Sequence, residues 1–306
     1  MENDIAIGVD LGGTNIRAAV VGGEGKILRK LKASSAGDPI RALAGMVAEL
    51  RGQYPGVRGV GLGTAGLVDR RGLRVIHSPN IPALAGRSFR SLNLGLPLVV
   101  ENDANAAALG ERWMGAGREF QDFVLFTLGT GIGGGIVQGG RLLGVAAEVG
   151  HMVIERDGER CSCGNNGCLE QYAAARAIVQ WLVREVEGGR ESLLLETMGG
   201  RLHGATAKDV AGAAREGDPL AREALRRAGR ALGVGIANMV NLLAPEAVIL
   251  TGGLVGAWDI YVEEAVREAS RRSMPGLFEG LRILPSALGA DDAGVLGAAA
   301  LVLENA

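Results

Sequence analysis

The chain lacks most of what marks a secreted, membrane-spanning or nucleic-acid-binding protein. Only three of its 306 residues are cysteine, so any disulfide would leave one thiol unpaired. No uninterrupted apolar stretch reaches the roughly 20 residues that span a bilayer, and no secretory signal pattern opens the sequence. A net charge of −2 gives no bulk attraction to a phosphate backbone. These absences predict a cytoplasmic protein that binds neither membrane nor nucleic acid.

Two kinds of residue are abundant instead. Hydrophobic residues make up 47% of the chain, which is enough for a large core in two domains or in one large domain. The chain also has 50 glycines, more than twice the usual share of roughly 7%. Many of them follow strand-like segments, where the backbone must turn tightly or approach something closely.

The three cysteines are gathered in one segment. Cys161, Cys163 and Cys168 lie within eight residues, and His151 precedes the first of them by ten residues. A set of three cysteines and one histidine is a usual ligand combination of structural zinc. The Gly-rich turn between the second and third thiols lets the backbone fold them around one point. Unligated buried cysteines are the alternative, but they would not need such clustering. The segment therefore predicts a zinc site.

The first half of the chain alternates short apolar runs with helical patterns. Asp38-Pro39 is typical of a helix start, with Asp as the N-cap and Pro in the first turn. We expect helices from there and over Ala104–Trp113, and strands over Ile5–Asp10, Asn15–Val21, Lys26–Lys32, Val57–Leu62 and Pro97–Val100.

The pattern restarts after Gly115-Ala-Gly117. Strands are expected over Asp122–Leu128, Ile136–Gln138, Arg141–Leu143, Ala247–Leu250 and Leu281–Leu284. Helices are expected over Leu169–Glu185, Thr206–Arg215, Pro219–Leu243, Tyr261–Arg272 and Ala293–Leu303. The repetition predicts two α/β domains that face each other across a cleft. We place them at residues 1–114, completed by the C-terminal helix 292–306, and at residues 115–291, which carry the zinc site.

The Gly-rich turns do not match the common nucleotide motifs. Gly129, Gly131 and Gly134 fit the G-x-G-x-x-G spacing, but a strand follows them where that motif requires a helix. No P-loop sequence occurs. What remains is one strand–turn–strand loop in each half, rich in Gly and Thr, and Thr251-Gly252-Gly253 after a later strand. Each alone reads as an ordinary hairpin or turn, but such loops can also point several backbone N–H groups at an anion.

Four motifs together resemble the ROK family. They are Asp10-Leu-Gly-Gly-Thr-Asn, Gly129-Thr-Gly-Ile-Gly-Gly-Gly, Glu148-Val-Gly-His and Cys161-x-Cys-Gly-x-x-Gly-Cys-x-Glu170. That family groups bacterial sugar kinases with transcriptional repressors, and the resemblance runs from about residue 5 to the C-terminus. It implies the two-domain actin-like, hexokinase-type ATPase fold with an interdomain cleft. The repressors carry an N-terminal helix-turn-helix. A first strand starting at Ile5 leaves no room for one, which favours the kinases.

The resemblance also implies roles for particular residues. Asp103 corresponds to the catalytic base, which would take the proton from the sugar 6-hydroxyl as that oxygen attacks the γ-phosphorus. Without the resemblance, Asp103 would be interpreted as a helix N-cap. The implied sugar-binding residues are Asn80, Asn102, Asp103, Glu148, His151 and Glu170. Taken singly, Asn80 would be a turn residue and Glu170 a solvated charge at a helix start.

The implied nucleotide site uses the Gly-rich turns. Asp10 is expected to reach Mg²⁺ through water, since this ion keeps several waters and takes few carboxylates. The expected ATP-binding residues are Asp10, Gly12, Gly13, Thr14, Asn15, Thr130, Gly131, Gly252, Gly253 and Leu254. The expected zinc ligands are His151, Cys161, Cys163 and Cys168, which makes His151 both a metal ligand and a sugar contact.

The predicted function is therefore ATP-dependent phosphorylation of the 6-hydroxyl of a hexose, in glycolysis. The run Cys168-Leu-Glu170-Gln-Tyr172 resembles glucokinases more than N-acetylhexosamine kinases, so glucose is the expected sugar. N-acetylglucosamine, mannose and fructose stay open, and so does a non-catalytic sugar-sensing regulator. The expected partners are sugar and ATP. The family's habit implies a homo-oligomer, either a dimer or a tetramer.

Overall fold

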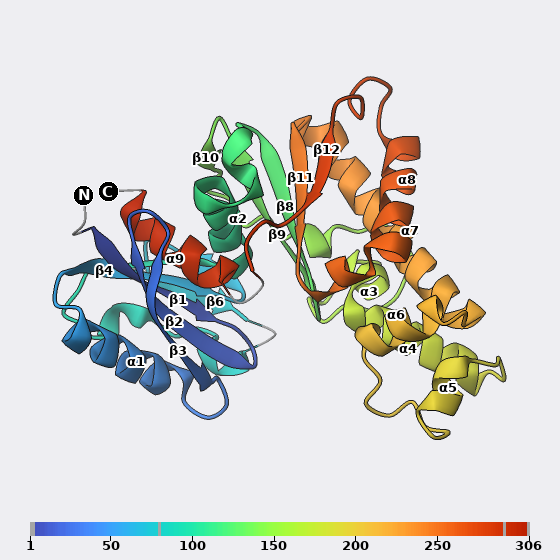
Figure 1. Cartoon of the computed structure of the whole chain (residues 1–306), viewed down its shortest axis with the longest axis horizontal. Helices are drawn as coiled ribbons and strands as arrows, with labels where there is room; N and C mark the ends of the chain where they lie inside the picture. The colour runs from blue at the N-terminus through green and yellow to red at the C-terminus, as the bar shows by residue number, and fades with distance from the viewer. Residues whose placement is uncertain (1–3, 79–80, 290–291, 305–306) are drawn as a thin grey trace. The chain divides into compact units, whose positions relative to one another are not determined.

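The computed structural model describes residues 4–78, 81–289 and 292–304, and the chain divides into two compact units. The first unit holds the chain up to Leu125, the segment Gly135–Ala147 and the chain from Ser286 onward. The second holds Phe126–Gly134 and Glu148–Pro285. The described residues form two five-stranded sheets, one of which lies wholly in the first unit (Figure 1). Among the described residues, no helix has both the length and the apolar character needed to cross a membrane.

The sheet of the first unit has the strand order β3-β2-β1-β4-β7. The first three strands form an antiparallel meander, and β1, β4 and β7 run parallel. A small antiparallel ribbon of β5 and β6 follows β4. The bounds are β1 Ile5–Leu11, β2 Asn15–Gly22, β3 Ile27–Ser34, β4 Val57–Thr64, β5 Leu67–Asp69, β6 Arg74–His77 and β7 Leu98–Asn102.

The two faces of this sheet pack on different helices. In β1, Ile7 and Val9 belong to the core beneath helix α1 (Pro39–Gln53), whereas Ala6 packs with helix α9 (Ala293–Leu303). This alternation is the period of two expected of a strand. Asp38 caps α1 as predicted, because its Oδ1 accepts hydrogen bonds from the next two free N–H groups. The short 3₁₀ segments Pro82–Leu84, Phe89–Ser91 and Ala116–Glu119 connect the other elements.

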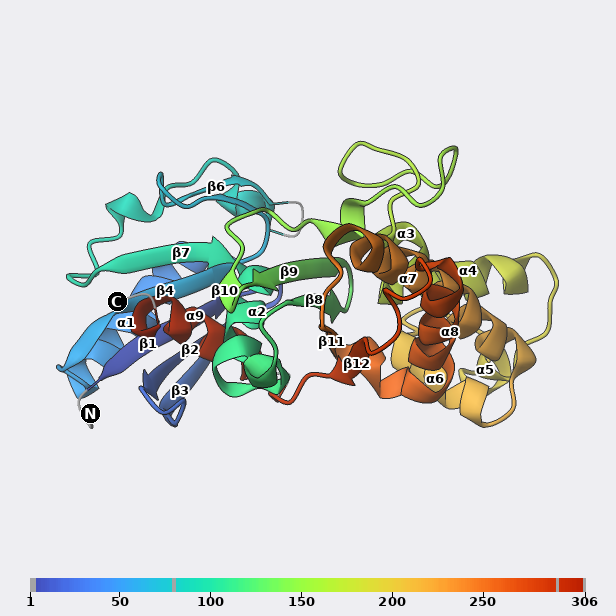
Figure 2. The same ribbon diagram turned by 90° about the horizontal axis from the view of Figure 1, so that it is seen from above.

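Glycine lets α9 lie directly on the sheet and on helix α2 (Asp103–Met114). A Cβ atom at Gly61 would overlap the carbonyl oxygen of Ala298, and one at Gly297 would overlap that of Ala106. Figure 2 shows α2 and α9 beside each other. Since α9 consists of small and apolar residues all round, it is suited to burial on several sides.

The other five-stranded sheet has the order β10-β9-β8-β11-β12. Its strands are β8 Phe123–Leu128, β9 Ile132–Gln138, β10 Arg141–Leu142, β11 Ala247–Thr251 and β12 Arg282–Pro285. Strand β10 belongs to the first unit, and β11 and β12 belong to the second. The division between the units passes through β8 and β9. The helical bounds are α3 Glu170–Ala173, α4 Ala175–Glu187, α5 Leu193–Thr197, α6 Ala207–Arg215, α7 Pro219–Leu243 and α8 Glu263–Arg272. Helix α7 packs against α3, α4, α6 and α8. The short helical turns are 3₁₀ Val149–His151, 3₁₀ Gly253–Ala257 and π Trp258–Val262.

The structure differs from the sequence predictions in three respects. Strand β9 begins at Ile132, within the Gly-rich run, rather than at Ile136. The single helix expected over Leu169–Glu185 is interrupted at Ala174, whose extended conformation lets Ala175 N–H donate to the carbonyl of Gly129 at 2.9 Å. A tertiary contact thus ends α3, which no local pattern could indicate. The ribbon β5–β6 and helix α5 were not predicted.

The close packing of α9 is testable with two helical glycines. Gly297→Ala puts a methyl group into the backbone of α2, so we expect a loss of about 1–3 kcal/mol in unfolding free energy, as for overpacked cores. Gly45→Ala, on the exposed face of α1 with open space around it, should instead gain roughly 0.5–1 kcal/mol. Urea denaturation measures both. An equal response of the two variants would contradict the packing of α9 described here.

Candidate active site and metal centre

The carboxyl ends of β1, β4 and β7 lie side by side. In the parallel register, Leu11 pairs with Thr64, and Thr64 pairs with Asn102. The Gly-rich turn after Leu11 and the β7–α2 junction therefore meet at one edge of the sheet, where open α/β sheets bind ligands. Asn80, predicted to contact sugar, lies outside the described residues.

At the β7–α2 junction, the helix cap is Asn102 and not Asp103. Asn102 Oδ1 accepts hydrogen bonds from the N–H groups of Ala104 (2.9 Å) and Asn105 (3.2 Å), and its Nδ2 donates to Gly66 O at 3.1 Å. The capping role that could have explained Asp103 thus belongs to its neighbour. The oxygen of Asn102 serves the helix, so a sugar hydroxyl would meet its N–H₂ group.

Asp103 is the first residue of α2 and is half-buried. Its Oδ1 accepts from the N–H of Ala104 at 2.9 Å. The positive end of the helix dipole favours a negative charge at this position. A carboxylate held here by one backbone donor and a helix N-terminus has the chemistry of a proton acceptor.

The first Gly-rich turn is tight and open to solvent. Gly12 N–H donates to Asn15 O at 3.0 Å, and the carbonyl of Thr14 accepts from Ser35 N–H at 3.1 Å. Gly13 and Thr14 are exposed at the tip. With no Cβ on Gly12 and Gly13, a phosphate could approach the backbone of this turn closely.

Asp10 stands at the base of the same turn. Its Oδ2 lies 3.2 Å from Nη1 of Arg17, which faces it across the β1–β2 pair. The start of α9 also lies against it, because a Cβ at Gly294 would be 2.7 Å from Asp10 Cγ. A carboxylate whose charge is already shared with an arginine suits contact with Mg²⁺ through water more than direct coordination.

The second Gly-rich turn joins β8 to β9 and also links two consecutive strands. Gly129 N–H donates to Gly131 O at 3.1 Å, and Thr130 is exposed. A Cβ at Gly131 would lie only 3.0 Å from Glu170 Oε2, so this turn touches α3. The predicted phosphate-binding residue Gly131 and the predicted sugar-binding residue Glu170 are therefore neighbours in the second unit.

The end of β11 lies against the end of β8. Gly252 has φ +100°, and a Cβ there would overlap the carbonyl oxygen of Leu128. Only glycine fits such a left-handed, crowded position. Gly252 and Gly253 are thus held beside the Gly129 turn, and the buried side chain of Leu254 follows in the next helical turn.

The metal-binding segment forms the predicted cluster. His151 Nδ1 lies 3.6 Å from Cys161 Sγ, and Cys163 Sγ lies 3.6 Å from Cys168 Sγ. All four ligand atoms are within 4.8 Å of one another, and none of the three thiols is in a disulfide. Around a tetrahedral zinc such pairs are separated by about 3.6–3.8 Å, given the usual bond lengths. The arrangement fits Zn²⁺.

Local backbone geometry builds this cluster. Cys161 N–H donates to Asn165 O at 2.8 Å, which closes the turn that carries Cys163. Gly167 has φ +74°, and a Cβ there would overlap the carbonyl of Glu155. Burial first, and the neighbouring thiols after it, raise the pKa of Cys168 to about 12. A zinc ion would reverse this, because it holds a coordinating thiol as thiolate.

Glu148 and Glu170, which are also predicted to bind sugar, lie near the Cys/His cluster. Glu170 Oε1 lies 3.4 Å from Cys161 Sγ, and Gln171 Nε2 lies 3.3 Å from the same oxygen. Burial raises the pKa of Glu148, with Glu170 adding to the effect and His151 opposing it. Glu170, which might have been a solvated charge, is half-buried. The structure thus brings Glu148, His151 and Glu170 together.

A match to the ROK family spans residues 6–305. The chain belongs to the ROK family. It is 37% identical over 310 residues to the glucokinase of Streptomyces coelicolor, with 98% of both chains covered. A ROK family glucokinase of Streptomyces griseus, solved with glucose and AMPPNP, superposes with a TM-score of 0.84 at 37% identity and covers 98% of this chain and 99% of its own. A ROK family transcriptional regulator, a homolog of the E. coli MLC protein, gives 0.85 at 26% identity, with 98% of this chain and 78% of the regulator covered.

These likenesses confirm the family and the hexokinase-type α/β fold expected from the motifs. Sequence reasoning missed one feature, the carboxylate of Glu101 behind the β7–α2 junction. Its signal was available, because an acidic residue that directly follows the apolar run Leu98-Val-Val100 in a strand needs a partner if it is buried.

The metal centre is testable by removing one ligand. Cys163→Ser should lose most bound zinc in elemental analysis and lower the melting temperature, because metal-binding energy is also folding energy. Ser162→Ala, at the exposed neighbouring position, should retain one zinc per chain. A parent protein purified without zinc, which also fails to bind it on addition, would refute the assignment.

Proposed function

We propose that the protein is an ATP-dependent hexose kinase that phosphorylates the 6-hydroxyl, with glucose as its preferred sugar. The observation that carries this proposal is Asp103. It opens α2 with its carboxylate at the sheet edge shared with a Gly-rich turn, while Asn102 performs the capping. The similar glucokinases, one of them solved with glucose and AMPPNP, support the choice of reaction and sugar.

Asp103 would act as general base. Its carboxylate would accept the proton of the 6-hydroxyl as that oxygen attacks the γ-phosphorus. The Ala104 N–H and the helix dipole hold the carboxylate in one orientation. Positioning of this kind supplies most of the catalysis in phosphoryl transfer, which needs little covalent chemistry from the protein.

Backbone groups of the two Gly-rich turns would hold the phosphates. The expected donors come from Gly12, Gly13, Thr14 and Asn15 in the first unit and from Thr130 and Gly131 in the second, with Gly252, Gly253 and Leu254 as a wall for the nucleotide. Mg²⁺ supplies charge neutralisation on the phosphate oxygens when bound. Asp10, paired with Arg17, would hold its water shell.

Sugar hydroxyls would be held by Asn80, Asn102, Glu148, His151 and Glu170. Carboxylates accept and amides both donate and accept, which fixes hydroxyl orientation. With Nδ1 of His151 facing Cys161, zinc would fix the ring and leave Nε2 for a hydroxyl. The ion would then be structural by coordination, yet it would orient a substrate contact.

Several finer points belong to the same proposal. N-acetylglucosamine, mannose and fructose kinases remain alternatives, because sugar choice depends on the surroundings of the 2-hydroxyl. The likeness to a ROK family regulator keeps a non-catalytic sugar sensor as the second candidate. We further propose the domain boundaries given above, a cytoplasmic role in glycolysis and a homo-oligomer.

A coupled ADP-release assay with a panel of free hexoses tests the function. Absence of ATP turnover with every sugar would favour the sensor.

Replacement of the proposed base gives the first activity prediction. Asp103→Asn keeps the shape of the side chain and removes its proton affinity, so kcat should fall at least about a hundredfold. Glucose binding, measured by calorimetry, should be largely kept. Asp38→Asn is the matched control, since it changes another Asp at a helix start into an equally good cap. A kcat near the parent value for Asp103→Asn would exclude Asp103 as the base.

Zinc removal gives the second activity prediction. If zinc orients His151 and the loop that carries Glu170, zinc-free Cys163→Ser should bind glucose at least about tenfold more weakly, the usual effect of losing an orienting partner. Its ATP affinity should change little, because the Gly-rich turns are built without the metal. Normal glucose affinity after complete zinc loss would leave zinc with a purely structural role.

A further inference from the structure

Glu101 has a carboxylate that the proposed mechanism does not use. It is the fourth residue of β7 and is only 5% exposed. Its Oε1 accepts hydrogen bonds from Asn102 N–H (2.8 Å), Asn105 Nδ2 (3.1 Å) and Arg70 Nη2 (3.0 Å), and its Oε2 pairs with Arg70 Nε. Every one of these partners is a donor. The site therefore suits a group that accepts hydrogen bonds at both oxygens, as the carboxylate of Glu101 does.

Two of these bonds hold the residues on either side of Asp103. The N–H of Asn102 is fixed from behind while its side chain caps α2, and Asn105 is fixed in the first turn of the same helix. Asp103 lies between these two anchored residues. The carboxylate of Glu101 therefore helps to fix the backbone position of Asp103. It does so through Asn102 and Asn105.

Asn105 is fully buried, and its N–H₂ group donates two hydrogen bonds. Besides Glu101, its Nδ2 donates to the carbonyl of Val145 at 2.9 Å. Both partners are acceptors, so the orientation of the amide is fixed. Its Oδ1 has no hydrogen-bond partner among the described residues, which is a cost in a buried position. An apolar residue would avoid this cost, and an asparagine here is explained by the two bonds that it donates.

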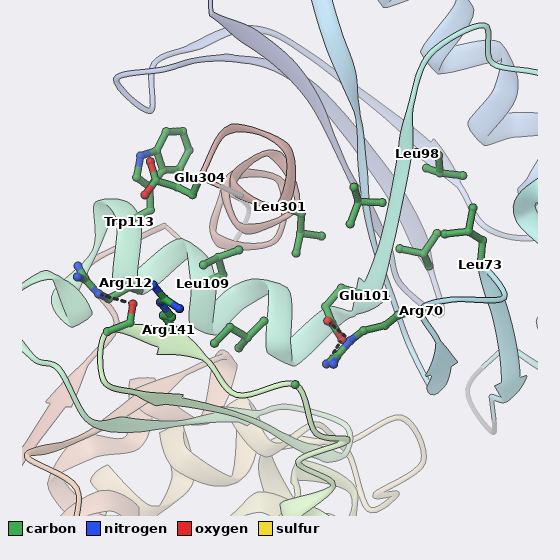
Figure 3. Close-up of a pocket in the computed structure, with 15 residues that line it drawn as sticks. Arg70, Leu73, Leu98, Glu101, Leu109, Arg112, Trp113, Arg141, Leu301 and Glu304 are labelled. Carbon is green, nitrogen blue, oxygen red and sulfur yellow. Dashed lines mark hydrogen bonds and ion pairs between the residues drawn. The ribbon is translucent and has the colours of Figure 1, made fainter. Parts of the chain in front are cut away.

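The same cluster holds the segment that leads to Glu148. Arg70 Nη2 lies 3.4 Å from Val145 O, the carbonyl that Asn105 also binds. Val145 is three residues before Glu148 in the chain. Figure 3 shows the guanidinium of Arg70 facing the carboxylate of Glu101 on the wall of a cavity of about 890 Å³. Arg70 reaches this position from the turn after β5, and its side chain is about one-third exposed.

A contribution to folding stability does not by itself explain a buried carboxylate at position 101. A buried ion pair is often no more stabilising than apolar residues of the same size, because its desolvation offsets the attraction. The three residues before Glu101 in β7 are apolar, so the strand itself does not require a charged group at this position.

We propose that Glu101, with Arg70 and Asn105, is a positioning residue for the proposed phosphoryl transfer. Glu101 fixes the backbone that presents Asp103, and the bonds to Val145 O hold the start of the sugar-binding segment. This inference rests on the proposed kinase function. It predicts that breaking the cluster lowers kcat while leaving nucleotide binding intact, since a displacement of about 1 Å at a reacting group can cost up to about a hundredfold.

The test compares two buried carboxylates. Glu101→Gln places an N–H₂ group among four donors, and we expect kcat to fall at least about tenfold with KM for ATP within about twofold of the parent. The matched control is Glu268→Gln in α8. That carboxylate has the same side-chain exposure of 6%, pairs with Arg272 at 2.5 Å, and lies in the second unit. Glu268→Gln should lose a similar amount of stability and keep its kcat.

Amide hydrogen exchange tests the positioning of the β7–α2 junction without requiring catalytic turnover. The N–H groups of Asn102 and Asn105 should exchange faster in Glu101→Gln than in the parent and stay unchanged in Glu268→Gln. Arg70→Gln leaves the bonds of Glu101 to Asn102 and Asn105 in place, so it should give a smaller loss of kcat. This variant replaces Glu101→Gln in the test if Glu101→Gln fails to fold. Unaltered kcat and exchange in the Glu101 or Arg70 variant, or equal losses in both carboxylate variants, would overturn the proposal. If the parent protein has no kinase activity, the proposed function is refuted. The exchange rates would then still show whether Glu101 holds the backbone on either side of Asp103.

Discussion

The hydrogen bonds that Asn102 Oδ1 accepts from the first turn of α2 are the interaction on which the candidate active site depends. They satisfy the helix start and place the next residue, Asp103, at the positive end of the helix. Glu101 stabilises this arrangement from the buried side. Under the proposed function, three consecutive residues would divide three tasks: Glu101 would support the backbone, Asn102 caps the helix, and Asp103 would accept the proton.

Glycine supplies the second constraint. Where α9 lies on the first sheet, Gly61 and Gly297 allow backbone atoms to meet without intervening side chains. At the ends of β8 and β11, Gly252 brings two loop segments together in the same way. The high glycine content therefore reflects close backbone packing in the core as well as open turns where phosphate would bind. The Cys/His cluster that fits zinc would add a third constraint, since Glu170 lies beside Cys161 and Glu148 lies near His151.

Local chemistry explains which parts of the fold were predictable. Helix α7 was predicted to its end residues because Asp218-Pro219 is a strong start signal, with two hydrogen bonds to the Asp218 side chain. The break at Ala174 was not predictable, because it depends on Gly129, 45 positions earlier in the chain. The zinc ligands followed from spacing alone and lie together. The role of Asp103 needed the family resemblance, since its local pattern favoured a cap that proves to be Asn102. The domain boundaries and the roles of the site residues stay predictions.

The central claim is that a hexose receives its phosphate on the 6-hydroxyl. The most direct measurement is phosphorus NMR of the reaction of the zinc-loaded protein with glucose, ATP and Mg²⁺. The account predicts a phosphomonoester whose phosphorus couples to the two protons of the sugar's terminal methylene, formed in equal amount with ADP. Release of inorganic phosphate without a sugar ester, or an ester on a ring hydroxyl, would contradict it.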